Sequence, residues 1–267
     1  MASQLDLVYA EGTDTGLVRS DNQDALFAGT LGLITAAGDP VHLFLVADGM
    51  GGYQGGDVAA RVAATFFRRA LWECHEDWPA TDHPQGWGEL LRSLVLQTNT
   101  KVIEAQATLG LPDMGTTLTA AVECQRIVHV VHVGDSRLYH FDGERLYQVT
   151  SDHSLVAELQ RQGQITDLEA RYHPKRNMIT QALGAAWDIT VETKSMELAP
   201  NSKLLLCSDG LSSMISDEDI SAVIQQDGDP YDQVHQLISL ANNRGGEDNI
   251  TVIIVGYRPR REEGSLL

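Results

Sequence analysis

Residues 46–56 read VADGMGGYQGG and follow directly on the apolar run Val41 to Leu45. Such a run is typical of a buried strand, and Asp48 and Gly49 end it. An Asp-Gly step by itself usually forms a tight turn. Five glycines within residues 49–56 exceed what one turn needs. They allow the backbone to approach a bound group closely, and the carbonyl oxygen of Gly49 would be unhindered by a side chain.

Two nucleotide-binding motifs do not fit this stretch. A dinucleotide fingerprint beginning at Gly49 would need a glycine where Gln54 stands. A P-loop beginning at Gly51 would need Lys and then Ser or Thr, where the chain has Asp57 and Val58. The glycines therefore indicate another kind of site.

Two further aspartates stand at the ends of strand-like runs. Asp209 follows KLLLCS, and Asp248 precedes NITVIIV. One such residue alone is most often a turn former, but three suggest convergence if the strands are neighbours. Two carboxylates ~4 Å apart repel by about 4 kcal/mol at an effective dielectric constant of ~20. A hard cation, Mg²⁺ or Mn²⁺, suits oxygen ligands of this kind.

Other candidate chemistry in the chain is weaker. His129 and His132 lie three apart on one predicted strand, so their rings should face opposite sides and serve as ordinary strand residues. The segment VGDSR at 133–137 lacks the GxSxG elbow of serine hydrolases. We interpret Gly134 and Asp135 as a hairpin turn between two strands, and Ser136 is not expected to be a nucleophile.

The periodicity predicts two pairs of helices among many strands. In the first pair, one helix follows Asp57 and the other spans about 88–108. In the second pair, Ser216 caps one helix, and the other begins at Pro230 and stops at Gly245 and Gly246. Strand-like runs are TTLTAAVE, RIVHVVHV, SRLYHF, RLYQVT, ITVETKSM, KLLLCS and NITVIIVGY. We predict an α+β fold, a four-layer α-β-β-α sandwich. Two central, mainly antiparallel sheets would each be covered by a pair of antiparallel helices.

Composition narrows the class of protein. The chain has 267 residues, enough for one large domain, and 19 Lys+Arg against 37 Asp+Glu give 19 − 37 = −18. This charge argues against nucleic acid as a partner. We found no repeat or long apolar stretch, so no membrane insertion is expected. Cys74, Cys124 and Cys207 lack disulfide or zinc spacing, which favours reduced thiols and a cytoplasmic location.

Eight segments in order resemble the metal-dependent protein serine/threonine phosphatase family (PPM, type 2C), bacterial type. They are RSDNQDA (19–25), VADGMGGYQGG (46–56), DMGTTLTAA (113–121), VHVGDSRLYHF (131–141), TSDHSLVAEL (150–159), NMITQALG (177–184), LLLCSDGL (204–211) and EDNITVIIV (247–255). The resemblance covers about residues 5 to 257. It implies a phosphatase domain at 1–258 with a flap subdomain at about 152–180, and leaves 259–267 as a short charged tail.

The resemblance implies a set of metal ligands. Asp48 matches the carboxylate that bridges two Mn²⁺ or Mg²⁺ ions, and Gly49 the residue whose carbonyl binds the second ion. Asp209 and Asp248 match the remaining ligands of the first ion. Asp113 matches the aspartate that bacterial relatives use, with the equivalent of Asp209, for a third and weaker ion.

The same resemblance assigns roles around the metals. Arg19 matches the arginine that binds the phosphate, and Asp24 an acidic residue that orders metal-bound water. Two positions depart from common family patterns: Met50 stands where eukaryotic relatives carry a histidine that is a candidate general acid, and Gln23 replaces a frequent glutamate. Tyr53 or a metal-bound water is left as the alternative proton donor.

The implied function is direct hydrolysis of phosphoserine and phosphothreonine in proteins by a hydroxide that bridges the metals. A bacterial serine/threonine kinase would be the opposing enzyme, and the phosphatase is expected to be a monomer. Two other classes stay open. A catalytically dead phosphoprotein-binding domain should have lost its metal aspartates, whereas this chain keeps them. The other is a metal-dependent phosphoesterase that acts on small molecules or on nucleic acid. The acidic charge disfavours nucleic acid as its substrate but not small molecules.

Overall fold

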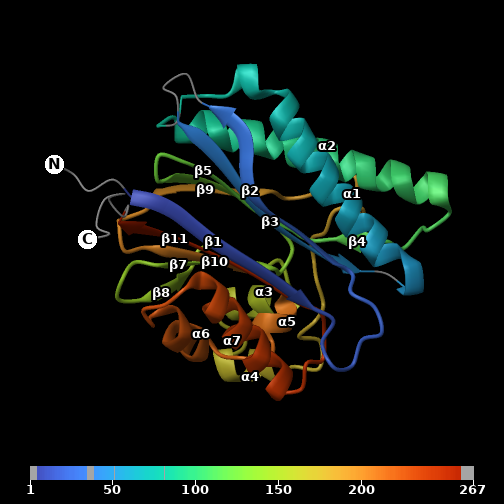
Figure 1. Ribbon diagram of the computed structural model, residues 1–267. Coiled ribbons are helices and arrows are strands. Elements are labelled where there is room, and N and C mark those ends of the chain that lie inside the picture. The colour runs from blue at the N-terminus through green and yellow to red at the C-terminus, as the bar shows by residue number, and fades with distance from the viewer. Residues whose placement is uncertain (1–4, 35–38, 51, 81, 260–267) are drawn as a thin grey trace.

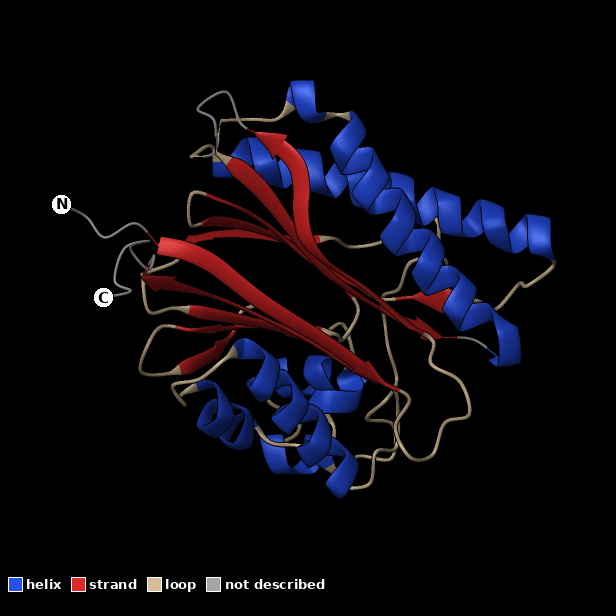
Figure 2. Cartoon of the chain, in the orientation of Figure 1, coloured by secondary structure: helices blue, strands red, loops and turns tan. Residues whose placement is uncertain are grey.

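Two β-sheets pack face to face, and helices cover both outer faces (Figure 1). The computed structural model describes residues 5–34, 39–50, 52–80 and 82–259. Figure 2 shows the resulting four layers, with the strands of both sheets between two groups of helices. The predicted α-β-β-α sandwich is confirmed.

The first sheet contains β3, which holds the apolar run before Asp48. Its order is β2-β3-β5-β6-β9, and the short strand β4 pairs with β3. All of these pairs are antiparallel. The strands are β2 (Asp24–Ile34), β3 (Pro40–Met50), β4 (Gly115–Thr116), β5 (Leu118–Cys124), β6 (Ile127–Val133) and β9 (Glu192–Glu197).

The second sheet has the order β1-β11-β10-β7-β8 and is also antiparallel. Its strands are β1 (Leu5–Asp14), β11 (Ile250–Pro259), β10 (Lys203–Cys207), β7 (Arg137–Phe141) and β8 (Leu146–Gln148). Strands β1 and β2 were not predicted. Each lies at the edge of its sheet, where side chains are only half-buried, so neither reads as an apolar run.

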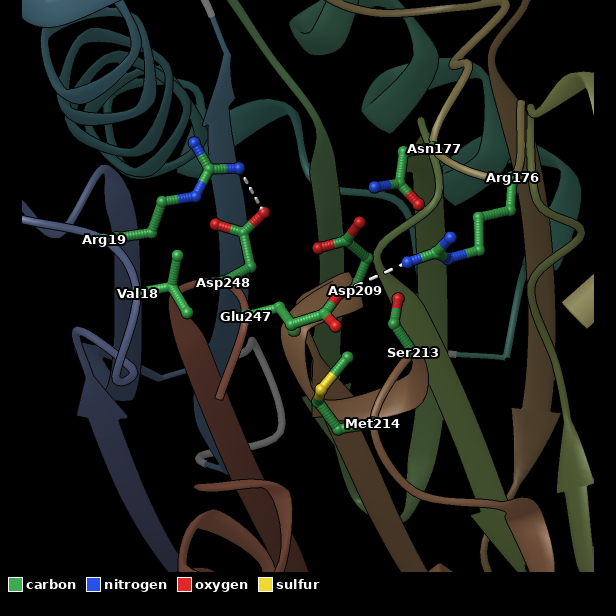
Figure 3. A pocket seen from close by; sticks show the side chains of 10 residues that line it. Val18, Arg19, Arg176, Asn177, Asp209, Ser213, Met214, Glu247 and Asp248 are labelled. Atoms are coloured by element: carbon green, nitrogen blue, oxygen red, sulfur yellow. Dashed lines mark hydrogen bonds and ion pairs between the residues drawn. The ribbon is translucent and has the colours of Figure 1, made fainter. Parts of the chain in front are cut away.

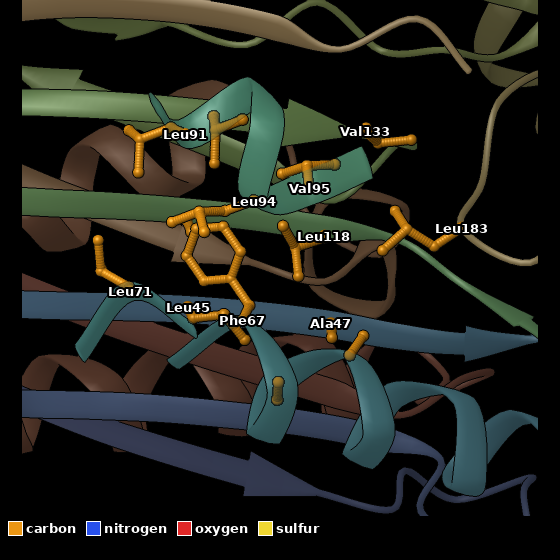
Figure 4. Close-up of a cluster of buried hydrophobic side chains, with 14 of the residues drawn as sticks. Leu45, Ala47, Phe67, Leu71, Leu91, Leu94, Val95, Leu118, Val133 and Leu183 are labelled. Carbon is orange, nitrogen blue, oxygen red and sulfur yellow. The ribbon is translucent and has the colours of Figure 1, made fainter. Parts of the chain in front are cut away.

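The first sheet is covered by α1 (Gly52–Glu73) and α2 (Pro84–Leu109), joined through the short 3-10 helix η1 (His75–Asp77). Buried aliphatic side chains from both helices and from β3, β5 and β6 form the core between them (Figure 4). Phe67, Leu91 and Leu45 are fully buried there. This cluster fixes the position of β3, the strand that carries Asp48.

Helix α1 begins at Gly52, so the predicted start at Asp57 is wrong. Glycine is a poor helix former, which made the glycine-rich stretch look non-helical. Close packing overrides that preference. A Cβ atom on Gly55 would lie 2.8 Å from the Cβ of Met114, and one on Gly56 would lie 2.7 Å from the carbonyl oxygen of Gly49.

Helices α5 (Asp209–Ser212), α6 (Asp217–Ile224) and α7 (Pro230–Asn243) lie on the second sheet. As predicted, Ser216 caps α6, and Pro230 occupies the first turn of α7. The predicted flap region contains α3 (Leu155–Arg161) and α4 (Asp167–Arg171). Thr166 and Glu169 form a capping box at the start of α4. None of the described helices is both long and apolar enough to cross a bilayer.

The connection from β6 to β7 passes from one sheet to the other. Strand β6 pairs with β5 and β9, whereas β7 pairs with β10 and β8, so the predicted hairpin at Gly134 and Asp135 is wrong. Gly134 has φ of +115°, and a Cβ there would lie 2.5 Å from a methyl carbon of Thr117. The crossing therefore depends on glycine, and it delivers Asp135 to one end of the sandwich.

Candidate active site

Four predicted site aspartates meet at one end of the sandwich. Asp24 opens β2 and is the register partner of Asp48 near the end of β3. Asp209 begins α5 directly after β10, and Asp248 lies just before β11. Strand β3 contacts β10 and β11 across the sandwich, so the two sheets bring all four carboxylates into mutual electrostatic range.

Burial makes this group of carboxylates costly to ionise. It raises the pKa of Asp48 well above its usual range, and the charges of Asp24 and Asp209 add to that effect. Burial also raises the pKa of Asp209 to about 6, with the charge of Asp248 as the next cause. The Asp209 carboxyl lies within hydrogen-bond distance of Asp48. Two adjacent carboxyl groups can remain so close only if a proton or a cation lies between them.

Asp24 is held through one of its two carboxylate oxygens. Its Oδ2 accepts hydrogen bonds from Ser208 Oγ at 2.8 Å and from Thr251 Oγ1 at 2.6 Å. Its Oδ1 is buried and has no hydrogen-bond partner within the described part of the chain. Burial raises the pKa of Asp24 to about 7. One oxygen of Asp24 is thus left for a ligand that the chain itself does not supply.

Asp135 joins this group and was missed in the sequence. It is buried, and its Oδ1 also has no hydrogen-bond partner among the described residues. Burial raises its pKa, and the charge of Asp209 contributes next. The signal was present, because Asp135 follows an apolar run just as Asp48 and Asp209 do. Interpreting Gly134 and Asp135 as a hairpin turn concealed it.

Arg19 lies at the mouth of the site. Its Nη2 contacts Asp248 Oδ2 at 2.7 Å, and its side chain is 52% exposed. Figure 3 shows Arg19 and Asp248 on one side of a 520 Å³ cavity, with Asp209 and Arg176 farther across. Arg176 forms an ion pair with Glu247 at 3.2 Å. The exposed rim of the cavity thus carries two guanidinium groups and the Glu247 carboxylate, while Asp209 lies deeper in the site.

The loop that carries Arg19 is tied to β11 by one side chain. Asn249 Nδ2 donates to the carbonyl oxygens of Thr15 at 2.9 Å and Asp21 at 3.0 Å, and its Oδ1 accepts from the backbone N–H of Gln23 at 2.8 Å. These three bonds hold both ends of the loop beside Asp248. The position of Arg19 is thus fixed by backbone anchoring.

A second cavity of 670 Å³ adjoins the first. Asp209, Ser213, Arg176 and Asn177 line both cavities, and the second extends between the flap helices and α6. Asp135 lies on its wall. A substrate larger than a phosphate group would therefore find room next to the aspartates.

The remaining predicted residues differ in their placement. Gly49 follows Asp48 directly, and a Cβ there would lie 2.2 Å from the carbonyl oxygen of Gly56, so only glycine fits. Asp113 lies on the exposed connection between α2 and β4. It is not among the groups whose charges are found to shift the pKa values of Asp24, Asp48 and Asp209.

The donor set matches a hard divalent cation in its chemistry. It consists of carboxylate oxygens, two of which are buried and unpartnered in the described part of the chain, on Asp24 and Asp135. No three His, Cys, Asp or Glu side chains of the described residues stand at metal-holding spacing. Asp48 lies against Asp209, and Asp248 against Arg19. Binding a cation would require these two pairs to separate.

The sheet sandwich with aspartates converging at one end defines a protein with a candidate site for hard divalent cations. The profile of the family described as Protein phosphatase 2C matches residues 17–242. The serine/threonine phosphatase stp of Listeria monocytogenes is 35% identical over 244 residues, which are 91% of this chain and 93% of that protein. The chain belongs to the protein phosphatase 2C family, and the resemblance predicted from the sequence is confirmed.

Solved structures agree with this assignment. The Mycobacterium tuberculosis serine/threonine phosphatase PstP/Ppp superposes with a TM-score of 0.77 at 37% identity, covering 94% of this chain and 98% of that chain. The catalytic domain of a serine threonine protein phosphatase PstP, solved in complex with two manganese ions, gives 0.76 at 35% identity, covering 95% and 99%. The predicted identification of the chain as a protein phosphatase is confirmed.

Proposed function

We propose that the chain removes phosphate from phosphoserine and phosphothreonine in proteins, using two divalent cations, Mn²⁺ or Mg²⁺. The convergence of buried, mutually repelling aspartates from both sheets carries this proposal, because it creates a demand for positive charge at one point. The manganese complex of the related PstP catalytic domain supports the choice of cation. When bound, the cations would activate water as the nucleophile and neutralise phosphate charge.

The chain supplies the ligands and the phosphate clamp. Asp48, Asp209 and Asp248 would hold the cations with the carbonyl oxygen of Gly49. Asp113 would serve a third and weaker ion, for which its exposed loop would have to come closer. Arg19 can leave Asp248 for a phosphate, since its planar guanidinium binds two oxygens and stays charged at all physiological pH values. Asp24 would orient the attacking water through its unpartnered Oδ1.

The proton donor for the leaving serine or threonine oxygen is a separate question. Met50 has no proton to give, so the histidine of eukaryotic relatives has no counterpart at this position. We retain a metal-activated water or Tyr53 as the donor. Asp135 is an additional acid beside Asp209, and burial favours its protonated form.

The substrate would be a phosphorylated protein, and a serine/threonine kinase acting on the same protein would be the opposing partner. The two adjoining cavities give such a segment room beside the aspartates. The net charge of −18 makes nucleic acid an unfavourable partner. We place the enzyme in the cytoplasm as a monomer, with a phosphatase domain at 1–258 and the flap at about 152–180.

One assay separates this function from its alternatives. Phosphate release is measured from a phosphothreonine peptide and from nucleotides, with Mn²⁺ and with a chelator, for the wild type and for Asp209→Ala. We expect release from the peptide with Mn²⁺ only, and its loss in the variant. Release from nucleotides alone would indicate a small-molecule phosphoesterase. Peptide binding without any release would indicate a catalytically dead binding domain.

The mechanism has its own test. Direct attack by water leaves no phosphate on the protein, so a rapidly quenched single-turnover reaction should yield only free phosphate and peptide. Capture of a covalent phosphoenzyme would overturn direct hydrolysis while leaving the substrate class intact.

A further inference from the structure

A closed ring of hydrogen bonds surrounds Asp24. Thr251 Oγ1 donates to Asp24 Oδ2 at 2.6 Å, and Thr251 Oγ1 lies 2.8 Å from Thr13 Oγ1. Asn22 Nδ2 donates to Thr13 Oγ1 at 2.8 Å. The ring closes through the backbone N–H of Asp24, which donates to Asn22 Oδ1 at 3.0 Å.

The direction of every bond in the ring follows from the chemistry of its ends. An ionised carboxylate can only accept, so once Asp24 is ionised the hydroxyl proton of Thr251 is committed to it. Thr13 must then donate to Thr251, and it can accept from the Asn22 amide. Each hydroxyl therefore both donates and accepts in one sense around the ring, an arrangement in which neighbouring bonds polarise and strengthen one another.

The ring joins Thr251 to a segment, residues 13–24, that lies far from it in sequence. Thr13 lies near the end of β1, Asn22 in the loop that carries Arg19, and Thr251 near the start of β11. Ser208, which follows β10, adds a fourth anchor, because its Oγ donates to Asp24 Oδ2 and accepts from the Thr251 backbone N–H at 2.9 Å. Asp24 is thus fixed to both sheets.

The anchoring is one-sided. Both hydroxyl donors bind Oδ2, while Oδ1 is buried and without a partner in the residues described. A carboxylate fixed through one oxygen presents the other in a defined direction, as outer ligands do around metal sites.

We propose that Thr251, Thr13 and Asn22 are positioning residues that hold Asp24 by Oδ2 and so keep Oδ1 available to the cation site. This inference rests on the proposed function in one respect, the placement of Asp24 in that site. In this role the three side chains would act through Asp24 alone.

The experiment measures Mn²⁺ affinity by calorimetry and kcat on a phosphothreonine peptide. Thr251→Val keeps the shape and removes the donor, and we expect about 10-fold weaker Mn²⁺ binding or a similar loss of kcat. Thr251→Ser keeps the hydroxyl and should restore most of the loss. Thr13→Val acts one bond farther away and should give a smaller loss of the same kind, which also provides a second variant if Thr251→Val folds poorly.

A double-mutant cycle separates positioning from general destabilisation. In an Asp24→Ala background the Thr251→Val change should have no further effect, because the residue through which it acts is gone. Thr98→Val is the matched control, since Thr98 is equally buried but lies on α2 and donates to the Leu94 carbonyl. It should leave Mn²⁺ affinity unchanged.

Two results would overturn the inference: wild-type Mn²⁺ affinity and kcat in both Thr251→Val and Thr13→Val, or an equal loss with and without Asp24. Failure of the proposed function is distinguishable, because it would appear as wild-type protein that releases no phosphate from the peptide, whatever the variants do to Mn²⁺ binding.

Discussion

Strands β3 and β11 run between two buried carboxylate sites that differ in how their charge is met. At one end, Glu123 is 2% exposed and accepts hydrogen bonds from Tyr257 Oη at 2.6 Å and the Arg126 backbone N–H at 2.7 Å. Its other oxygen lies 2.8 Å from His42 Nδ1. At the opposite end, Asp48 and Asp24 face further carboxylates.

The difference separates a carboxylate that the protein itself pairs from the carboxylates that we propose as cation ligands. Glu123 has a protein partner at each oxygen, which stabilises the contact between the two sheets. Burial raises the pKa values of Asp48 and Asp24, and the charges of the neighbouring aspartates raise them further. One carboxylate oxygen of Asp24 and one of Asp135 have no partner among the described residues. A fold keeps such a group only where an external cation meets the charge or where function outweighs the cost in stability.

The largest effect is expected at the aspartate end. Asp48→Asn keeps the shape of the side chain and removes its charge, so the site should lose its cation and its electrostatic stabilisation of the reaction. We expect phosphatase activity to fall on the order of 1,000-fold. Steady-state assays with a phosphothreonine peptide and Mn²⁺ measure this loss.

The same variant provides its own control for folding. Without metal, Asp48→Asn should be more stable than the wild type, because a repelling carboxylate is gone and the new amide can donate to Asp209. Urea unfolding in the presence of a chelator measures the difference. A variant that is both inactive and less stable than the wild type would show that Asp48 is structural, as Glu123 is.

The next effect is a pH dependence of the metal-free protein. Folding raises the pKa values of Asp24 to about 7 and Asp209 to about 6 from an ordinary value of 3.8, so the folded state holds protons that the unfolded chain releases. The stability from these groups is present in full below about pH 4 and is lost as the pH rises through 6 to 7. Since one pKa unit corresponds to about 1.4 kcal/mol, these two shifts predict a loss of several kcal/mol of unfolding free energy between about pH 4 and pH 7.

Urea titrations at several pH values, with chelator, test the pH dependence. Saturating Mn²⁺ should reverse the trend at pH 7, since a ligand that binds only the folded state stabilises it. A metal-free protein whose stability is flat between pH 4 and 8 would contradict the view that these carboxylates repel one another.

A smaller effect is expected at the opposite end of the sandwich. Glu123→Ala leaves the Tyr257 hydroxyl, the Arg126 N–H and the His42 ring without their acceptor, and should cost about 2 kcal/mol of unfolding free energy. The kcat should stay at the wild-type value. Glu123→Gln retains an acceptor and should lose less. A strong fall in kcat for Glu123→Ala at full folding would break the distinction between the two ends.

The two ends also differ in how far the sequence predicts them. Asp48, Asp209 and Asp248 were found because each stands at the end of an apolar run, and Arg19 and Asp24 through their family motif. Asp135 follows a run of the same kind, but the crossing between sheets that brings it to the site depends on which strands pair. Local sequence patterns therefore predict where a strand ends better than they predict which strands pair.

The wrong prediction of the helix start and the two edge strands that were not predicted have related causes. Gly55 and Gly56 lie in the first turns of α1, where Met114 and Gly49 pack against them, and the contact with Met114 is long-range. Strands β1 and β2 have partners on one side only, so their sequences lack a continuous apolar run. In each case tertiary packing decides what local propensity leaves open.

The smallest effect is expected for the exposed ion pair between Arg19 and Asp248, one of the carboxylates of the site. Arg19 and Asp248 have side chains that are 52% and 32% exposed, so water screens their 2.7 Å contact. Arg19→Ala should therefore change the metal-free free energy of unfolding by less than about 1 kcal/mol, as is usual for exposed pairs. The measurement is urea unfolding with chelator at pH 7, with Arg69→Ala, whose partner is Glu73 on the same helix, as an exposed-pair control. A loss of several kcal/mol would mean that Arg19, and not a cation, is the counter-charge of the aspartates, and the contrast with Glu123 would then disappear.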